Sequence, residues 1–202
     1  MGYNIVLAGV GGQGIITSAR ILADAVLASG GNVLVAETHG LSQRGGSVVV
    51  HVRVGDVEAP LIPPGMGDLL IGLEAIEAAR YVNLLKPGSP ITVNAEVQPP
   101  PLPKITVPSL DKIIKALGEA GYTVYSIPAT TEASKLGDAR SMNTLLLGYA
   151  SGLGLLDQVA PPEALAGSVA RVIRRSSIAV KAFWHGFKLA TAQSMTTLKR
   201  QR

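Results

Sequence analysis

The chain has 202 residues, a formal net charge of +4 at pH 7 and no cysteine. Apolar residues make up 47% of it and charged residues 16%, which suits a single domain, or one with an appendage, built on a sizeable core. Without cysteine the chain by itself cannot form a disulfide, an iron–sulfur cluster or a thiolate metal site. Its three scattered histidines argue against any other metal site.

Composition also argues against membrane and nucleic-acid classes. The longest apolar runs are short and broken by glycine or proline, so no membrane span is expected. A strand begins almost at the N-terminus and leaves no room for a secretory leader, which predicts a cytoplasmic protein. Aromatic residues make up 4% of the chain, too few for the basic and aromatic face that binds nucleic acid. The low charge content is typical of a chain that is partly covered by a partner.

In chain order, the first half predicts a nucleotide-type β-α-β unit followed by a third strand. The expected strands are residues 3–8, 33–36 and 47–54, and the expected helix is residues 14–29. The crossover between the first two strands should be right-handed. In the third strand, His51 and Arg53 alternate with apolar residues, which indicates one partly exposed face and a position near the edge of the sheet.

The second half continues the alternation of strands and helices. The expected strands are residues 69–73, 90–94 and 123–127, and the expected helices are residues 74–85, 110–120, 143–155, 163–174 and 178–195. The proline-rich run 99–103 cannot lie in a central strand and is predicted to be a surface connection. Helix 143–155 is rich in glycine and alanine, which allows close packing against a neighbour. The pattern predicts a doubly wound, mostly parallel, Rossmann-like α/β sheet in one domain, 1–202, with a helical tail at about 162–198.

The first glycine-rich turn fits the dinucleotide-binding pattern G-x-G-x-x-G between a strand and a helix. Backbone N–H groups and the helix N-terminus attract an anion in this context. The candidate binding residues are Gly9, Gly11, Gly12, Gln13 and Gly14. Glu37 ends the second strand, near the position of a ribose-binding acid. However, Gln13 puts a long amide where small or apolar residues usually pack, and a tight turn without a ligand stays an open alternative.

A second glycine-rich segment follows the second strand and is not required by an ordinary nucleotide fold. Its candidate binding residues are Gln43, Arg44, Gly45 and Gly46. The guanidinium of Arg44 could bind a carboxylate or phosphate through two hydrogen bonds, and Gln43 could add an amide. Alternatively, Arg44 pairs with Glu37 inside its own loop. We predict that the two loops converge on one charged ligand or partner.

Other polar residues are given structural roles, and no catalytic residue or metal ligand is assigned. Asn143 either caps the helix that it opens or faces the first loop. Thr130 and Glu132 follow Pro128 and are typical of helix caps. His185, beside the one tryptophan, is expected to be packed. Ser47 is a poor nucleophile candidate, because no Ser-His-Asp arrangement is legible.

Together these residues resemble the gamma-type component of the 2-oxoacid:ferredoxin oxidoreductases. The resemblance covers nearly the whole chain. It includes residues 9–14 (GVGGQG), 37–48 (ETHGLSQRGGSV) and 72–80 (GLEAIEAAR), and continues through 128–130 and 137–148. The first of these segments is shared among the gamma components. The second is similar to the small (beta) subunit of the arylpyruvate, or indolepyruvate, branch.

The resemblance implies a holoenzyme that oxidatively decarboxylates an arylpyruvate on thiamine diphosphate. Electrons would pass through iron–sulfur clusters to ferredoxin, and an aryl-acetyl-CoA would form. A large partner subunit would hold the thiamine diphosphate and the clusters. This chain would bind no cofactor alone, would be inactive alone, and would line the approach to the active site, including that of CoA. Three alternatives stay open: a gamma subunit for pyruvate, 2-oxoisovalerate or 2-oxoglutarate, a stand-alone NAD- or FAD-binding Rossmann protein, and a nucleotide-binding regulatory module.

Overall fold

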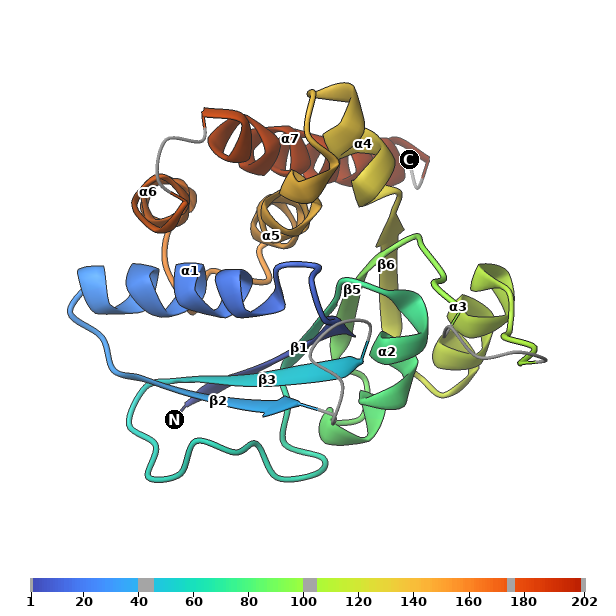
Figure 1. Ribbon diagram of the computed structural model, residues 1–202, viewed down its shortest axis with the longest axis horizontal. Coiled ribbons are helices and arrows are strands. Elements are labelled where there is room, and N and C mark those ends of the chain that lie inside the picture. The colour runs from blue at the N-terminus through green and yellow to red at the C-terminus, as the bar shows by residue number, and fades with distance from the viewer. Residues whose placement is uncertain (1, 40–45, 100–104, 174–176, 201–202) are drawn as a thin grey trace.

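The computed structural model describes residues 2–39, 46–99, 105–173 and 177–200. They form a six-stranded sheet with helices on both faces (Figure 1). The strands are β1 (Tyr3–Val10), β2 (Val33–His39), β3 (Ser47–Val54), β4 (Leu69–Gly72), β5 (Pro90–Asn94) and β6 (Thr123–Ile127). Their order in the sheet is β2-β3-β1-β4-β5-β6. The predicted α/β fold is therefore confirmed, while the proline-rich connection lies mostly outside the described residues.

β3 is inserted between the two strands of the expected β-α-β unit, and it runs in the opposite direction to both. β3 lies between β1 and β2 and runs antiparallel to both, whereas β1, β4, β5 and β6 pair in parallel. The connection from β2 to β3 is residues 40–46, and a parallel crossover needs a dozen residues or more. A chain this short has to return antiparallel. β2 is consequently the edge strand, and β3 is one strand further in.

His51 is buried within β3, not on the partly exposed face that the alternation indicated. Its side chain is 5% exposed, and its Nδ1 accepts a hydrogen bond from the backbone N–H of Ile62 at 3.2 Å. Burial first, and then the positive charge of Arg53, lower the pKa of the imidazole. The ring is therefore held neutral as an acceptor in the folded chain.

Replacing His51 with asparagine should flatten the fall in stability on the acid side of neutrality. The unfolded histidine takes up a proton near its ordinary pKa of about 6.5, whereas the folded one resists protonation. Its contribution is present above that pH and is lost as the pH falls toward the folded pKa. In His51→Asn, Oδ1 can accept from Ile62 without titrating. Denaturant unfolding between pH 7 and 5 measures this effect, and equal pH slopes for the two proteins would contradict it.

Helices cover the two faces of the sheet unequally. They are α1 (Ile15–Ala28), α2 (Ala75–Arg80), α3 (Leu110–Glu119), α4 (Ala129–Lys135), α5 (Met142–Gly152), α6 (Pro162–Val172) and α7 (Ser177–Arg200), with 3-10 turns η1 (Val82–Leu84) and η2 (Ala139–Ser141). The larger core lies on the side of α1, α5 and α6, with α7 packed on α5, and the smaller core lies under α2 and α3 (Figure 1). Two predictions were inaccurate: the expected helix 74–85 is divided into α2 and η1, and α4 was not predicted. In the described part of the chain, no helix combines the length and apolarity that crossing a membrane requires.

Helices α5 and α7 approach each other at two glycines. A Cβ atom on Gly148 of α5 would lie 1.9 Å from the carbonyl oxygen of Phe183, and one on Gly186 of α7 would lie 2.0 Å from that of Leu145. The backbones therefore touch directly, which only residues without a side chain permit. This contact confirms the close packing that the composition of helix 143–155 predicted.

Candidate functional site

The first glycine turn joins β1 to α1 and is closed by the side chain of Gln13. The side-chain Oε1 accepts a hydrogen bond from the backbone N–H of Val10 at 2.9 Å. The backbone N–H of Gln13 donates to the carbonyl oxygen of Val10 at 3.1 Å. A Cβ atom on Gly9 would lie 2.7 Å from that same Oε1. The long amide that looked out of place in a dinucleotide turn therefore has a local task, because it folds back over Gly9 and fixes the turn.

The two glycine loops meet at a backbone hydrogen bond. Gly11 N–H donates to the carbonyl oxygen of Gly46 at 2.9 Å. Gln43, Arg44 and Gly45 lie outside the described residues, so their predicted contacts, including the pair of Arg44 with Glu37, stay predictions. The described end of the second loop is nevertheless anchored against the first.

Ser47, the residue after Gly46, is anchored as well. The hydroxyl of Ser47 donates to Oε2 of Glu77 at 2.5 Å and lies 2.8 Å from the hydroxyl of Tyr81. Glu77 is 7% exposed, and Nε of Arg80 lies 3.2 Å from the same carboxylate oxygen. Ser47 therefore ties the start of β3 to helix α2, which agrees with its poor standing as a nucleophile.

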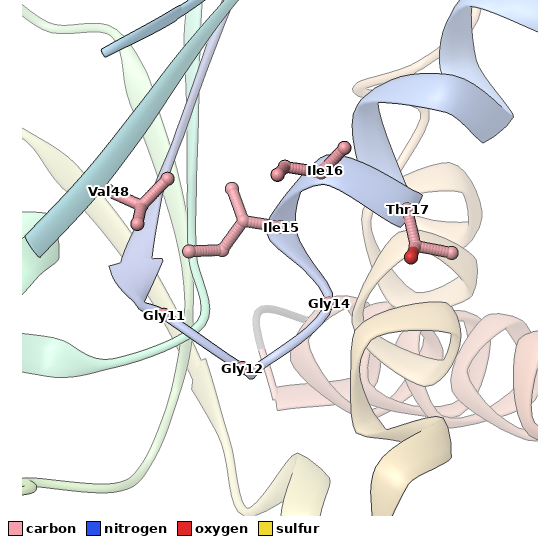
Figure 2. Close-up of a pocket in the computed structure, with 7 residues that line it drawn as sticks. All are labelled: Gly11, Gly12, Gly14, Ile15, Ile16, Thr17 and Val48. Atoms are coloured by element: carbon pink, nitrogen blue, oxygen red, sulfur yellow. The ribbon is translucent and has the colours of Figure 1, made fainter. Parts of the chain in front are cut away.

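An apolar pocket of about 290 Å³ opens on the β3 side of the first turn. Its lining residues are Gly11, Gly12, Gly14, Ile15, Ile16, Thr17 and Val48. Figure 2 shows Ile15 pointing toward Val48, while Thr17 points away from both, toward the other side of the turn. Ile16 is 39% exposed although it is apolar. The pocket thus combines hydrocarbon walls with the amino end of α1.

A second cleft, of about 430 Å³, opens on the other side of the same turn, at the carboxyl ends of β1, β5 and β6. It is lined by Gly12, Gln13, Gly14, Thr17, Glu96, Gln98, Thr130, Ala139, Arg140, Met142 and Asn143. In open α/β sheets, ligands bind outside the carboxyl ends of the strands where the strand order reverses. Here that reversal lies between β1 and β4, so the cleft occupies the expected place for a ligand.

Glu96 and its neighbours form a part of the cleft that sequence reasoning missed. Oε2 of Glu96 accepts the hydroxyl of Thr130 at 2.6 Å and Nδ2 of Asn94 at 3.0 Å. Asn94 is fully buried and also donates to Oγ1 of Thr130 at 2.9 Å. Thr130 therefore bonds across to β5 and does not cap its helix. A signal was present, because polar residues directly after a parallel strand mark the ligand edge of the sheet.

Asn143 connects the first turn to α5. Its Nδ2 donates to the carbonyl oxygen of Gly14 at 3.2 Å, and the side chain is 4% exposed. Of the two roles left open, the structure shows the one in which Asn143 faces the first loop. Gly14 has a φ of +84°, and a Cβ atom there would lie 2.6 Å from Nδ2 of Asn143. A side chain at Gly14 would therefore both strain the turn and displace Asn143.

The remaining charged residues at or near the cleft pair locally. The guanidinium of Arg140 donates to both carboxylate oxygens of Asp138, at 2.9 and 3.0 Å, and lies in open solvent. These bonds lower the pKa of Asp138. On α4, Glu132 accepts from His185 of α7 at 2.9 Å, and hydrogen bonds from Lys135 and His185 lower the pKa of Glu132. His185 is thus a contact between helices, as expected.

The structure weakens the dinucleotide interpretation. Glu37 lies on the edge strand β2, which β3 separates from β1. Adjacent strands are about 4.8 Å apart, so β2 is roughly twice that distance from the strand that precedes the glycine turn. A ribose-binding acid normally stands on the adjacent strand. Glu37 therefore does not occupy that position.

Comparison with known proteins identifies the family. The model of the pyruvate ferredoxin/flavodoxin oxidoreductase family matches residues 4–189. The chain belongs to this family. Among its relatives, the indolepyruvate oxidoreductase subunit IorB of Archaeoglobus fulgidus is 44% identical over 155 residues, which are 75% of this chain and 77% of the relative. The subunit of the same name from Thermococcus kodakarensis is 41% identical over 74% of this chain and 76% of its own length.

Solved structures of this oxidoreductase family share the fold. The gamma subunit of a keto/oxoacid ferredoxin oxidoreductase from Geobacter sulfurreducens superposes with a TM-score of 0.69 and 24% identity, over 94% of this chain and 99% of its own. A pyruvate oxidoreductase subunit from Thermotoga maritima gives a TM-score of 0.66 and 20% identity, over 95% and 96%. In the 2-oxoglutarate:ferredoxin oxidoreductase of Magnetococcus marinus, the same fold makes up 31% of the chain, with a TM-score of 0.67 and 19% identity.

Proposed function

We propose that this chain is the non-cluster-bearing subunit of a 2-oxoacid:ferredoxin oxidoreductase that converts arylpyruvates, indolepyruvate in particular, to aryl-acetyl-CoA. The observation that carries the proposal is its 38–44% identity to four relatives named as indolepyruvate oxidoreductase subunits, over about three quarters of the chain. The loop at residues 37–48, whose pattern favours the arylpyruvate branch, supports the same substrate class.

Of the iron–sulfur clusters and the thiamine diphosphate of such an enzyme, the clusters do not fit the residues of this chain. Clusters are held by cysteine thiolates, and the chain has no cysteine. Within the described ranges, no three His, Asp or Glu side chains gather where a metal ion could bind. A large partner subunit supplies these groups in our proposal, and the isolated chain is inactive.

The share of this chain is to line the approach of the substrates. The first turn of α1 leaves backbone N–H groups without an acceptor in the helix, and Gly14 and Thr17, at this end of α1, line both cavities beside the glycine turn. We assign the phosphate groups of CoA to Gly12, Gln13 and Gly14, with Gly9 and Gly11 shaping the turn. Residues 43–46, above all the Arg44 guanidinium, would bind an anionic group of CoA or of the partner.

Co-expression with the large subunit tests the proposal. The complex should reduce ferredoxin with indolepyruvate and CoA, and the isolated chain should not. Because a pocket shaped for an aromatic side chain gains little from a small one, kcat/KM should be about tenfold or more higher for indolepyruvate than for pyruvate or 2-oxoglutarate. A complex that prefers a small 2-oxoacid would overturn the substrate class. Micromolar binding of NAD or FAD by the isolated chain would instead favour the stand-alone Rossmann alternative.

A further inference from the structure

Two walls of the 430 Å³ cleft carry polar groups of opposite chemistry. One wall is the glycine turn with the amino end of α1, including Gly12, Gly14 and Thr17, where N–H dipoles attract an anion. The other wall carries the carboxylate of Glu96, half-buried at the end of β5. The positive charge of Arg140 is shared with Asp138, so it does not neutralise Glu96. A ligand that is anionic throughout would therefore be repelled on one side of the cleft.

Hydrogen bonding fixes which atom of Glu96 is left for a ligand. The Asn94 amide donates to Oγ1 of Thr130, so the Thr130 hydroxyl has to donate onward to Oε2 of Glu96. Asn94 donates to that same Oε2. Among the described contacts, Oε1 accepts no hydrogen bond. The carboxylate is thus held by one oxygen, and the other remains an acceptor that requires a donor.

Asn94 keeps this arrangement rigid. It is fully buried, and its Nδ2 also lies 3.2 Å from the carbonyl oxygen of Leu73, while its Oδ1 accepts the backbone N–H of Thr130 at 3.3 Å. These bonds join the ends of β4, β5 and α4. The Glu96 carboxylate is consequently held by groups on β5 and α4, and its reorientation would take the acceptor away from the Thr130 hydroxyl.

We propose that Glu96 determines which part of a ligand enters this side of the cleft: it accepts a hydrogen bond from an uncharged hydroxyl or amide and excludes phosphate. The inference rests on the proposed function, in which CoA is the co-substrate. CoA carries phosphates at one end and a pantetheine arm with amide N–H and hydroxyl donors at the other. Its phosphates would lie at the glycine turn, and a donor of the arm would lie at Oε1 of Glu96.

Glu96→Gln should change the affinities for two ligands in opposite directions. Thr130 and Asn94 both donate to one oxygen, so the glutamine must place its carbonyl oxygen there and its NH2 toward the cleft. The acceptor becomes a donor and the negative charge is lost. In titrations of the assembled complex, the Kd of CoA should rise about tenfold, while the Kd of inorganic pyrophosphate should fall severalfold.

A purely structural role would weaken both ligands together, so shifts of equal sign, or no shift, would overturn the inference. Glu96→Asp, which keeps the charge but withdraws Oε1, should weaken CoA and leave pyrophosphate unchanged. Glu119→Gln, the same chemical change on the exposed end of α3, is the matched control and should alter neither. The Kd values are measured without turnover. If they shift in opposite directions as expected, but the complex oxidises no 2-oxoacid, the proposed function is wrong and the inference about Glu96 stands. An active complex without these opposite shifts would overturn the inference alone.

Discussion

Gly148→Ala should destabilise the chain more than the other single glycine-to-alanine substitutions that we consider. The added carbon would lie 1.9 Å from the Phe183 carbonyl oxygen and 2.6 Å from its carbon. Neither atom can rotate away, because both belong to the backbone of α7, so the two helices have to separate. We expect a loss of about 3 kcal/mol or more, since overpacking a rigid contact reaches or exceeds that range. For a chain of this size that is a fall in Tm of about 6–12 °C.

Gly118→Ala is the matched control for that experiment. Gly118 lies within helix α3, its φ is not in the left-handed region, and nothing stands within 4 Å of the Cβ that the substitution adds. Alanine is the better helix former by about 0.5–1 kcal/mol, so this variant should be slightly more stable than the parent. If thermal unfolding gave both variants the same Tm, the helix contact would not limit stability.

Gly14→Ala should impair ligand binding in the assembled complex more than it impairs folding. The residue adopts a φ of +84°, which costs a side-chain-bearing residue about 1–2 kcal/mol, and its new carbon would collide with Nδ2 of Asn143. Both cavities share Gly14, so displacement of Asn143 and of the turn alters both. The Kd of CoA should rise about tenfold or more, as expected when a well-placed polar contact is lost.

Two further variants separate strain from collision. Gly12→Ala has the same left-handed problem, with a φ of +103°, but nothing lies within 4 Å of its Cβ, so it should weaken CoA binding less than Gly14→Ala. In the double variant Gly14→Ala, Asn143→Ala, the obstructing amide is gone and part of the affinity should return. A double variant that binds no better than Gly14→Ala alone would show that the collision is not the cause.

The sequence predicts the elements of this fold well because each depends on residues that lie close together in the chain. β5 and β6 begin and end at the predicted residues, and α1 ends at Ala28, within one residue of its expected end. The glycine-rich composition of α5 also predicted a close neighbour, although not that α7 would be that neighbour. Such features depend on periodicity and on turn residues, which lie within a few positions of one another.

The sequence does not predict contacts that depend on the sheet order. The bond from Asn143 to Gly14 spans 129 residues, and the bond from Thr130 to Glu96 spans 34. Both exist because β1, β5 and β6 end at one edge of the sheet, which no local pattern states. The antiparallel direction of β3, by contrast, can be predicted from the sequence, because residues 40–46 are too few for a parallel crossover. Recognising it would have removed Glu37 from the ribose position.

The hydrogen bond from Gly11 to Gly46 has a thermodynamic consequence. It ties the glycine turn, which borders both cavities, to Gly46, so a protein that displaced Gly46 would also displace the turn where we propose that CoA binds. Linkage of this kind is reciprocal. If docking of the partner changes the affinity for the small molecule by some factor, the small molecule changes the affinity for the partner by the same factor. If CoA binds at the turn as we propose, assembly strength measured by dilution should then vary with CoA concentration, and breaking the Gly11–Gly46 bond should weaken that dependence.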